Sequence, residues 1–172
     1  MRRTLTILAA ACAIFLAPIF AAEPVTFTLK EKGAPTLHVK ETKNGVIFEE
    51  YKGKVVLLNF FGKNCKYCMK EIPDLIDLQK RYKKSFQVVA IHVQERMSPG
   101  ERSRMNKRFN FNYPIYEVDD NYQLFRYIAQ RAGYTGSIPF SIIFDRNGSA
   151  AKIIPGYAPK ETLEHMIKVL TQ

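Results

Sequence analysis

The sequence predicts an α/β fold, and three consecutive stretches carry that prediction. Residues 54–61 (KVVLLNFF) form a continuous run of apolar and β-branched residues, which is typical of a central strand covered on both faces. Residues 65–84 then space their apolar side chains in a helical pattern, and residues 86–93 (FQVVAIHV) form a second buried strand. A strand, a helix and a strand in this order predict a βαβ unit with a right-handed crossover.

The rest of the chain completes one domain over residues 23–172. It contains no internal repeat, low-complexity tract or linker that would divide it. We expect a hairpin near Asn44-Gly45, because Asn-Gly favours a tight turn between strands. The other expected elements are a basic helix around 98–108, a short strand at 113–118, a helix at about 122–132, two strands at 140–144 and 150–154 joined by a turn at 145–148, and a last helix at about 160–170.

The first 22 residues have the pattern of a bacterial export signal. Two arginines precede a run from Leu5 to Ala22 that is apolar apart from Thr6, and the first acidic residue is Glu23. Cleavage after Ala22 would put the bulky Phe20 where a small residue is preferred. We therefore expect either a cleaved signal peptide or an N-terminal membrane anchor, since the run is just long enough to span a bilayer. The domain should be periplasmic, either soluble or anchored to the inner membrane.

The expected mature domain is strongly basic. The chain has 26 lysines and arginines against 16 acidic residues, so removing Arg2 and Arg3 leaves 24 basic residues and a net charge of +8. Residues 95–110 contain five of these cations. No aromatic residues alternate with the basic ones as they would in a nucleic-acid site, so a solvated helix face is expected and no nucleic-acid partner.

Cys65 and Cys68 are the only cysteines outside the N-terminal segment, whose Cys12 is interpreted as a small apolar residue. A spacing of two residues suits a metal site, a structural disulfide or a redox centre. Zinc needs three or four protein ligands, which the chain does not easily supply, so we expect no metal. The remaining nitrogen ligands are three histidines expected to be ordinary surface or core residues: His38, His92 and His165.

The placement of the cysteine pair favours redox chemistry. A disulfide across two residues removes little entropy from the unfolded chain, so it is a poor structural crosslink. The strand ends at Phe61 and Cys65 stands where the helix begins, so free amides and the helix dipole should lower the pKa of Cys65. Lys66 adds a cation, and Lys66 and Tyr67 are expected to modulate the pair. Cys65 is therefore predicted to attack, and Cys68, one turn inward, to resolve the mixed disulfide.

Residues 51–75 (YKGKVVLLNFFGKNCKYCMKEIPDL) carry a resemblance to a known family. A GK-hydrophobic-N-F strand precedes the cysteines, and the pattern CxxCxxE-x-P follows with Glu71 and Pro73 in place. A late Ile138-Pro139 precedes a hairpin. These features resemble the thioredoxin fold and, more narrowly, the exported TlpA/ResA/CcmG (DsbE) family of thiol-disulfide oxidoreductases. The resemblance covers most of residues 25–172 and implies a central mixed β-sheet flanked by helices.

The resemblance also assigns a substrate-binding element. It implies that Pro139 is a cis-proline beside the dithiol and that Ile138 and Pro139 bind an extended substrate segment. Gly136 fits a tight approach to that turn. The family usually has tryptophan directly before the first cysteine, where this chain has Asn64. That departure changes the surface presented to partners.

Proton transfer to Cys68 needs a group that the thioredoxin pattern does not supply here. Cytoplasmic thioredoxins carry a buried acid six residues before the attacking cysteine, and this chain has Asn59 there, as is usual in the TlpA-like branch. Water or another carboxylate must then serve. The candidates are Glu71 and Glu49.

The resemblance implies a reductant of protein disulfides, with apocytochrome c cysteine pairs as substrates during cytochrome c maturation. Electrons would come from a DsbD- or CcdA-type membrane protein, and the redox-active Cys65–Cys68 disulfide would be the only redox group. An isomerase or oxidase of the same fold would use the same cysteines. A copper metallochaperone is a rival of another class, since thiolates favour Cu(I). Such sites usually have three residues between the cysteines, and His92 has no evident route to the pair.

Overall fold

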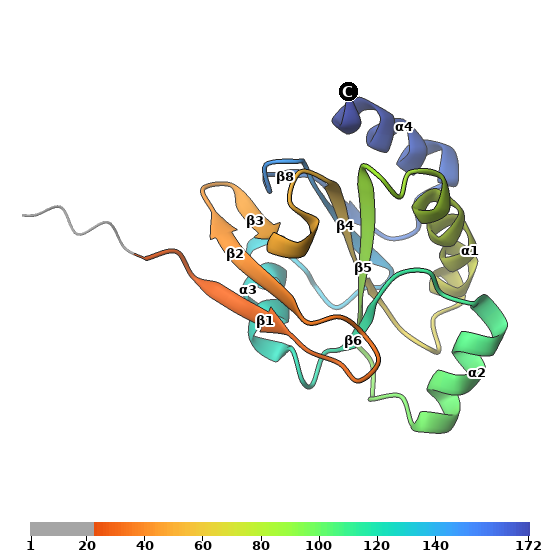
Figure 1. Ribbon diagram of the computed structural model, residues 1–172. Helices are drawn as coiled ribbons and strands as arrows, with labels where there is room; N and C mark the ends of the chain where they lie inside the picture. Colours follow the sequence, from red (N-terminus) through yellow and green to blue (C-terminus); the bar gives the residue numbers. More distant parts are fainter. Residues whose placement is uncertain (1–22) are drawn as a thin grey trace, which may run out of the picture.

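A five-stranded mixed sheet forms the centre of the protein in the computed structural model, which describes residues 23–172 (Figure 1). The strand order is β6-β5-β4-β7-β8. β4 (Val55–Phe61), β5 (Phe86–His92) and β6 (Ile115–Glu117) run parallel, whereas β7 (Phe140–Phe144) is antiparallel to β4 and to β8 (Ala150–Pro155). The predicted mixed sheet and its C-terminal hairpin are therefore confirmed.

β4 and β5 are buried at every residue, which explains their continuous apolar sequences. Their parallel register pairs Val55 with Phe86 at one end and Phe61 with His92 at the other. Helix α1 (Lys66–Arg81) connects them, so the predicted βαβ unit is present. Because parallel strands end at the same edge of a sheet, the segment after Phe61 lies beside the end of β5.

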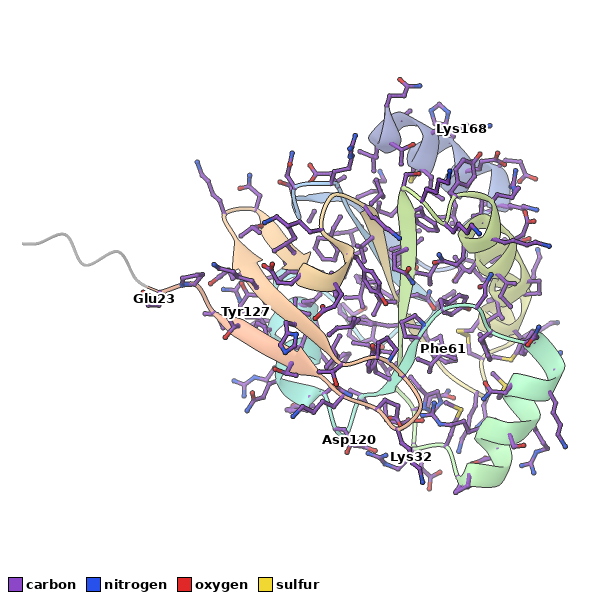
Figure 2. All side chains as sticks on the ribbon, viewed as in Figure 1. Glu23, Lys32, Phe61, Asp120, Tyr127 and Lys168 are labelled. Carbon is purple, nitrogen blue, oxygen red and sulfur yellow. A yellow bond between two sulfur atoms is a disulfide. The ribbon has the colours of Figure 1, made fainter. Side chains whose placement is uncertain are left out.

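The four helices between residues 23 and 172 lie on the two faces of the central sheet (Figure 1). α1, α2 (Pro99–Phe109) and α4 (Lys160–Thr171) cover one face, and α3 (Tyr122–Arg131) lies on the other. Each lies within a few residues of its predicted position. Their apolar side chains fill the space between helices and sheet (Figure 2), with Leu75 of α1 and Ile167 of α4 fully buried.

A small antiparallel sheet covers the α3 face of the central sheet. It has the order β1-β2-β3, with β1 (Thr26–Leu29), β2 (Leu37–Thr42) and β3 (Gly45–Phe48). The hairpin predicted near Asn44-Gly45 joins β2 to β3, whereas β1 was not predicted. A short 3₁₀ turn, η1 (Glu49–Tyr51), then leads into the start of β4.

The expected signal peptide or membrane anchor, residues 1–22, lies outside the described residues. Between residues 23 and 172, no helix combines the length and the apolar character needed to cross a bilayer.

Candidate active site

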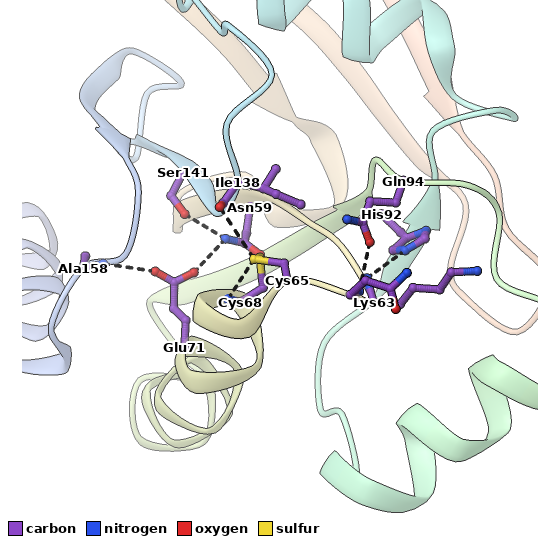
Figure 3. Close-up of a disulfide and its surroundings, with 11 residues drawn as sticks. Asn59, Lys63, Cys65, Cys68, Glu71, His92, Gln94, Ile138, Ser141 and Ala158 are labelled. Carbon is purple, nitrogen blue, oxygen red and sulfur yellow. Dashed lines mark hydrogen bonds between the residues drawn. A yellow bond between two sulfur atoms is a disulfide. The ribbon is translucent and has the colours of Figure 1, made fainter.

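The junction between β4 and α1 holds Cys65 and Cys68, which form a disulfide (Figure 3). Cys65 is the N-cap of α1, and its Sγ accepts a hydrogen bond from the Cys68 amide at 3.1 Å. Cys65 is partly exposed, whereas Cys68 is 1% exposed. An incoming sulfur can therefore reach Cys65 but not Cys68.

The loop before β7 lies directly against the disulfide. The Ile138-Pro139 peptide bond is cis, as the family resemblance implied. The carbonyl oxygen of Ile138 lies 3.6 Å from Cys65 Sγ. Gly136, with φ of 96°, adopts a backbone conformation that side chains disfavour, so a glycine is required there. The loop thus places main-chain groups beside the accessible sulfur.

A buried carboxylate lies on α1, one turn beyond Cys68 (Figure 3). Glu71 is 2% exposed, and its two oxygens accept hydrogen bonds from Asn59 Nδ2 at 3.0 Å and the Ala158 amide at 3.3 Å. Asn59 Nδ2 also donates to Ser141 Oγ at 3.0 Å. Burial raises the pKa of Glu71 to about 7, although its two hydrogen bonds oppose that shift.

The structure brings only one of the two predicted proton-transfer residues to the site. Glu71 shares a face of α1 with Cys68, because residues three apart are neighbours on a helix. Glu49 is exposed in η1, at the start of β4, whereas the disulfide follows the end of that strand. Seven strand residues separate the two ends by about 20 Å. The expectation for Glu49 is therefore wrong.

The residues between the two cysteines point outward. Lys66 is exposed and Tyr67 is 60% exposed. The Tyr67 ring lies 6.4 Å from the ring of Tyr157, and Lys70 Nζ lies 4.3 Å from the centre of the same Tyr157 ring. The surface on this side of the disulfide is therefore aromatic and basic, although Asn64 replaces the usual tryptophan.

Two side chains from the end of β5 hold the loop that precedes Cys65. His92 Nε2 accepts from the Lys63 amide at 3.1 Å, and Gln94 Oε1 accepts from the Asn64 amide at 2.9 Å (Figure 3). A side chain at Gly62 would overlap the Gln94 carboxamide. Sequence reasoning missed both contacts, although polar residues where β5 ends beside β4 were a usable signal. His92 contacts the loop that carries Cys65, through the Lys63 amide.

His92 belongs to a buried charged cluster. Its Nδ1 lies 2.9 Å from Glu117 Oε2, and Arg102 Nη2 lies 2.6 Å from Glu117 Oε1. His92 and Glu117 are 0% and 1% exposed. Burial acts to raise the pKa of Glu117, but the hydrogen bond from His92 and the charges nearby, Arg102 and Arg96 among them, lower it below its ordinary value.

The surroundings of the cysteine pair bear on the rival copper interpretation. Between residues 23 and 172, no group of three or more histidine, cysteine, aspartate or glutamate side chains is placed to hold a metal ion. Both ring nitrogens of His92 already have partners, Lys63 and Glu117. His92 is therefore not free to join the cysteines as a copper ligand.

Comparison with known proteins connects the chain to thiol-disulfide chemistry. Residues 26–154 match the AhpC/TSA family. The chain is 32% identical over 120 residues to thiol-disulfide oxidoreductase ResA of Geobacillus kaustophilus, a match that spans 69% of this chain and 64% of that relative. It is 28% identical over 142 residues to the ResA protein of Bacillus thuringiensis, spanning 81% of this chain and 78% of the relative. The match to the first relative thus covers less than two thirds of its length.

Solved structures show the same fold. A thiol:disulfide interchange protein of the thioredoxin family from Chlorobium tepidum superposes with a TM-score of 0.65 at 26% identity, covering 74% of this chain and 87% of that one. StoA from Bacillus subtilis superposes with a TM-score of 0.58 at 19% identity, covering 84% and 97%. The predicted thioredoxin fold is confirmed.

Proposed function

We propose that this chain, which belongs to the AhpC/TSA family, is a thiol-disulfide oxidoreductase that exchanges electrons with cysteine pairs of other proteins. One observation carries the proposal: at the start of α1, a disulfide joins an accessible Cys65 to a buried Cys68 beside the cis Pro139 loop. A structural crosslink would need neither the asymmetry in exposure nor that loop. The names of the sequence relatives support the same activity.

The reduced protein would transfer two electrons in two exchange steps. The Cys65 thiolate attacks one sulfur of a substrate disulfide, forming a mixed disulfide and releasing the other substrate sulfur as a thiolate. Cys68 then loses its proton and attacks Cys65 Sγ. This step forms the Cys65–Cys68 disulfide and releases the second substrate thiolate, so the substrate gains two electrons and the protein loses two. A dithiol donor reverses the same steps to regenerate the reduced protein.

Glu71 would move the proton of Cys68. A general base works best when its pKa lies near the working pH, and burial raises the pKa of Glu71 to about 7. Its place on the same helical face as Cys68 supports this role. Glu71 would accept the Cys68 proton, directly or through one water, as Cys68 attacks and would return it to the leaving substrate thiolate.

The finer proposal is a periplasmic reductant in cytochrome c maturation. Its substrates would be apocytochrome c cysteine pairs, and its electrons would come from a DsbD- or CcdA-type membrane protein. The TlpA/ResA/CcmG-like sequence around the site supports this direction, and the ResA relatives are named as thiol-disulfide oxidoreductases. Ile138 and Pro139 would hold an extended substrate segment against Cys65, since their loop lies against the sulfur.

The test combines an equilibrium measurement with trapping. A reductant should reduce insulin, and its potential in glutathione buffers should lie well below the −120 mV or so of the strong oxidant DsbA. The Cys68→Ser variant expressed in its host should accumulate mixed disulfides through Cys65, and Cys65→Ser should accumulate none. A potential near −120 mV with the protein mainly oxidised in vivo would assign an oxidase instead. Failure of Cys68→Ser to trap any protein would reject the protein-substrate role.

A further inference from the structure

We propose that His92 is a positioning residue for thiol-disulfide exchange: it holds the Cys65 loop in place and connects that loop to helix α2 through Glu117 and Arg102. The inference rests on the proposed function, since it concerns the reactivity of Cys65. It gives a role to the basic helix, which the sequence marked as a solvated face.

The loop that carries Cys65 has little regular structure of its own. It is a single turn in which the Cys65 amide donates to the Gly62 carbonyl oxygen at 3.2 Å. The amides of the two central residues point out of that turn, toward the end of β5. His92 accepts one of them and Gln94 the other. Without these acceptors the two amides would turn to water, and the turn would lose two of the contacts that orient it against the sheet.

The hydrogen bonds of His92 determine which tautomer it adopts. Nε2 accepts from the Lys63 amide, so this nitrogen carries no hydrogen. Nδ1 must then carry the hydrogen and donate it to Glu117 Oε2. The charged form of Glu117 is stabilised by Arg102, so the carboxylate orients the imidazole from behind. His92 is thus a neutral ring. Glu117 fixes its orientation through Nδ1, and its Nε2 holds the Lys63 amide.

Helix α2 reaches the loop by a second path. Lys63 Nζ pairs with Glu101 Oε1 at 3.0 Å, and the Lys63 side chain is only 11% exposed. Glu101 also closes the capping box with Ser98 at the start of α2. The main chain of Lys63 is therefore tied to Arg102 through His92 and Glu117, and its side chain is tied to the adjacent Glu101. Two consecutive residues of α2 hold one residue of the loop.

The chemical consequence is the position of the attacking sulfur. Cys65 lies two residues after Lys63, and its sulfur must meet a substrate beside the Ile138 carbonyl oxygen. Displacements of about 1 Å in a reacting group can cost up to about a hundredfold in rate. Removing the acceptor at His92 would free the Lys63 amide and let the turn move. The buried dithiol partner, Cys68, would not move with it, because it packs within α1.

The test compares two substitutions of His92. In His92→Gln, the carboxamide oxygen can accept from Lys63 while its NH₂ group donates to Glu117; His92→Leu can do neither. Reduced protein is mixed with the small disulfide DTNB, and amide hydrogen exchange is followed by NMR. We expect His92→Leu to react about tenfold more slowly and to lose protection at the Lys63 amide, whereas His92→Gln stays close to wild type. A folded His92→Leu variant with the wild-type rate and Lys63 protection would overturn the proposal.

Arg102→Gln covers the case in which His92→Leu does not fold, because Arg102 lies at the surface end of the cluster, with its side chain 25% exposed. It should slow the DTNB reaction and weaken Lys63 protection by a smaller factor. The matched control is Arg104→Gln, which removes an exposed arginine from the same helix. Equal behaviour of Arg102→Gln and Arg104→Gln would overturn the link to α2. DTNB is not a protein substrate, so the two tests are independent. If the wild-type protein does not reduce insulin, the proposed function is rejected, but the DTNB rates of the His92 and Arg102 variants still test the positioning role.

Discussion

Two buried glutamates flank the Cys65 loop, and their surroundings give them opposite properties. Glu71 and Glu117 are 2% and 1% exposed. Glu71 receives hydrogen bonds only from neutral groups, Asn59 and Ala158, and its pKa is raised to about 7 by burial. Glu117 faces Arg102 and His92, which outweigh its burial and lower its pKa. Burial alone therefore does not determine the charge of a carboxylate; the partner does.

The opposite pKa shifts suit Glu71 to proton transfer and Glu117 to positioning. A carboxylate that titrates near pH 7 can take up and release a proton during turnover. A carboxylate held ionised by an arginine cannot, but it can orient the histidine in front of it. Glu71 adjoins the resolving cysteine, whereas Glu117 acts on the loop of the attacking one. Each glutamate thus has the electrostatic state that suits its neighbour.

The largest expected effect is on turnover, and it should fall on one glutamate only. Glu71→Gln keeps the shape and the acceptor oxygen but cannot accept a proton. We expect the second exchange step to slow by about a hundredfold at neutral pH, so that the mixed disulfide through Cys65 accumulates. Rapid-quench mass spectrometry of the reduced variant with a disulfide peptide measures this. Glu117→Gln is the matched comparison: it should act mainly on the first step, through His92 and the Cys65 loop, and so accumulate far less mixed disulfide. Equal accumulation of the mixed disulfide in Glu71→Gln and Glu117→Gln would contradict a proton-transfer role specific to Glu71.

A smaller effect concerns stability as pH changes. The pKa of Glu71 rises from an ordinary 4.5 to about 7 on folding, so the folded state keeps its proton longer. Its contribution to stability is fully present below about pH 4.5 and is lost as pH rises through about 7. At about 1.4 kcal/mol for each pKa unit, the wild type should lose about 3 kcal/mol relative to Glu71→Gln. Urea unfolding of the oxidised proteins between pH 4 and pH 8 measures this difference.

Glu117→Gln should show the reverse sign and provides the control. The pKa of Glu117 is lowered on folding, so its contribution is present above about pH 4.5 and is lost as pH falls through the folded value. The wild type should therefore lose stability relative to Glu117→Gln below about pH 4.5, so for this pair the urea measurement extends to about pH 3. A constant difference between Glu71→Gln and wild type across the pH range would show that Glu71 is ionised in the folded protein like an exposed glutamate.

Local sequence patterns predicted the surroundings of Glu71 better than those of Glu117. Consecutive residues were enough to predict β4, β5 and the start of α1 at Cys65. They also showed the three-residue spacing that puts Glu71 on the same helical face as Cys68. The pair His92–Glu117 spans 25 positions and forms only because β5 and β6 align side by side. No spacing in the sequence reports that register.

The error at Glu49 has a related cause. The sequence shows a carboxylate shortly before a buried strand, but the site lies after that strand, so the length of β4 separates them. The strand β1 was missed because its four residues alternate between exposed and buried positions too briefly to be distinguished from a polar segment. The Glu49 error depended on how separate elements come together, and the β1 error on a segment too short to show a period; periodicity records neither.

The smallest expected effect concerns the exposed charge of Lys66, in contrast to the buried carboxylates of Glu71 and Glu117. Lys66 follows Cys65 directly and is exposed, so water and salt screen its charge far more than the charge of Arg102 beside Glu117. We expect Lys66→Gln to slow iodoacetamide labelling of Cys65 at pH 7 by about twofold or less, because a nearby cation favours the thiolate. The difference should vanish at about 1 M salt, where the screening length falls to about 3 Å. A tenfold or greater drop in the labelling rate that persists in high salt would contradict this. It would mean that Lys66, and not the buried Glu71 or Glu117, dominates the electrostatics at Cys65.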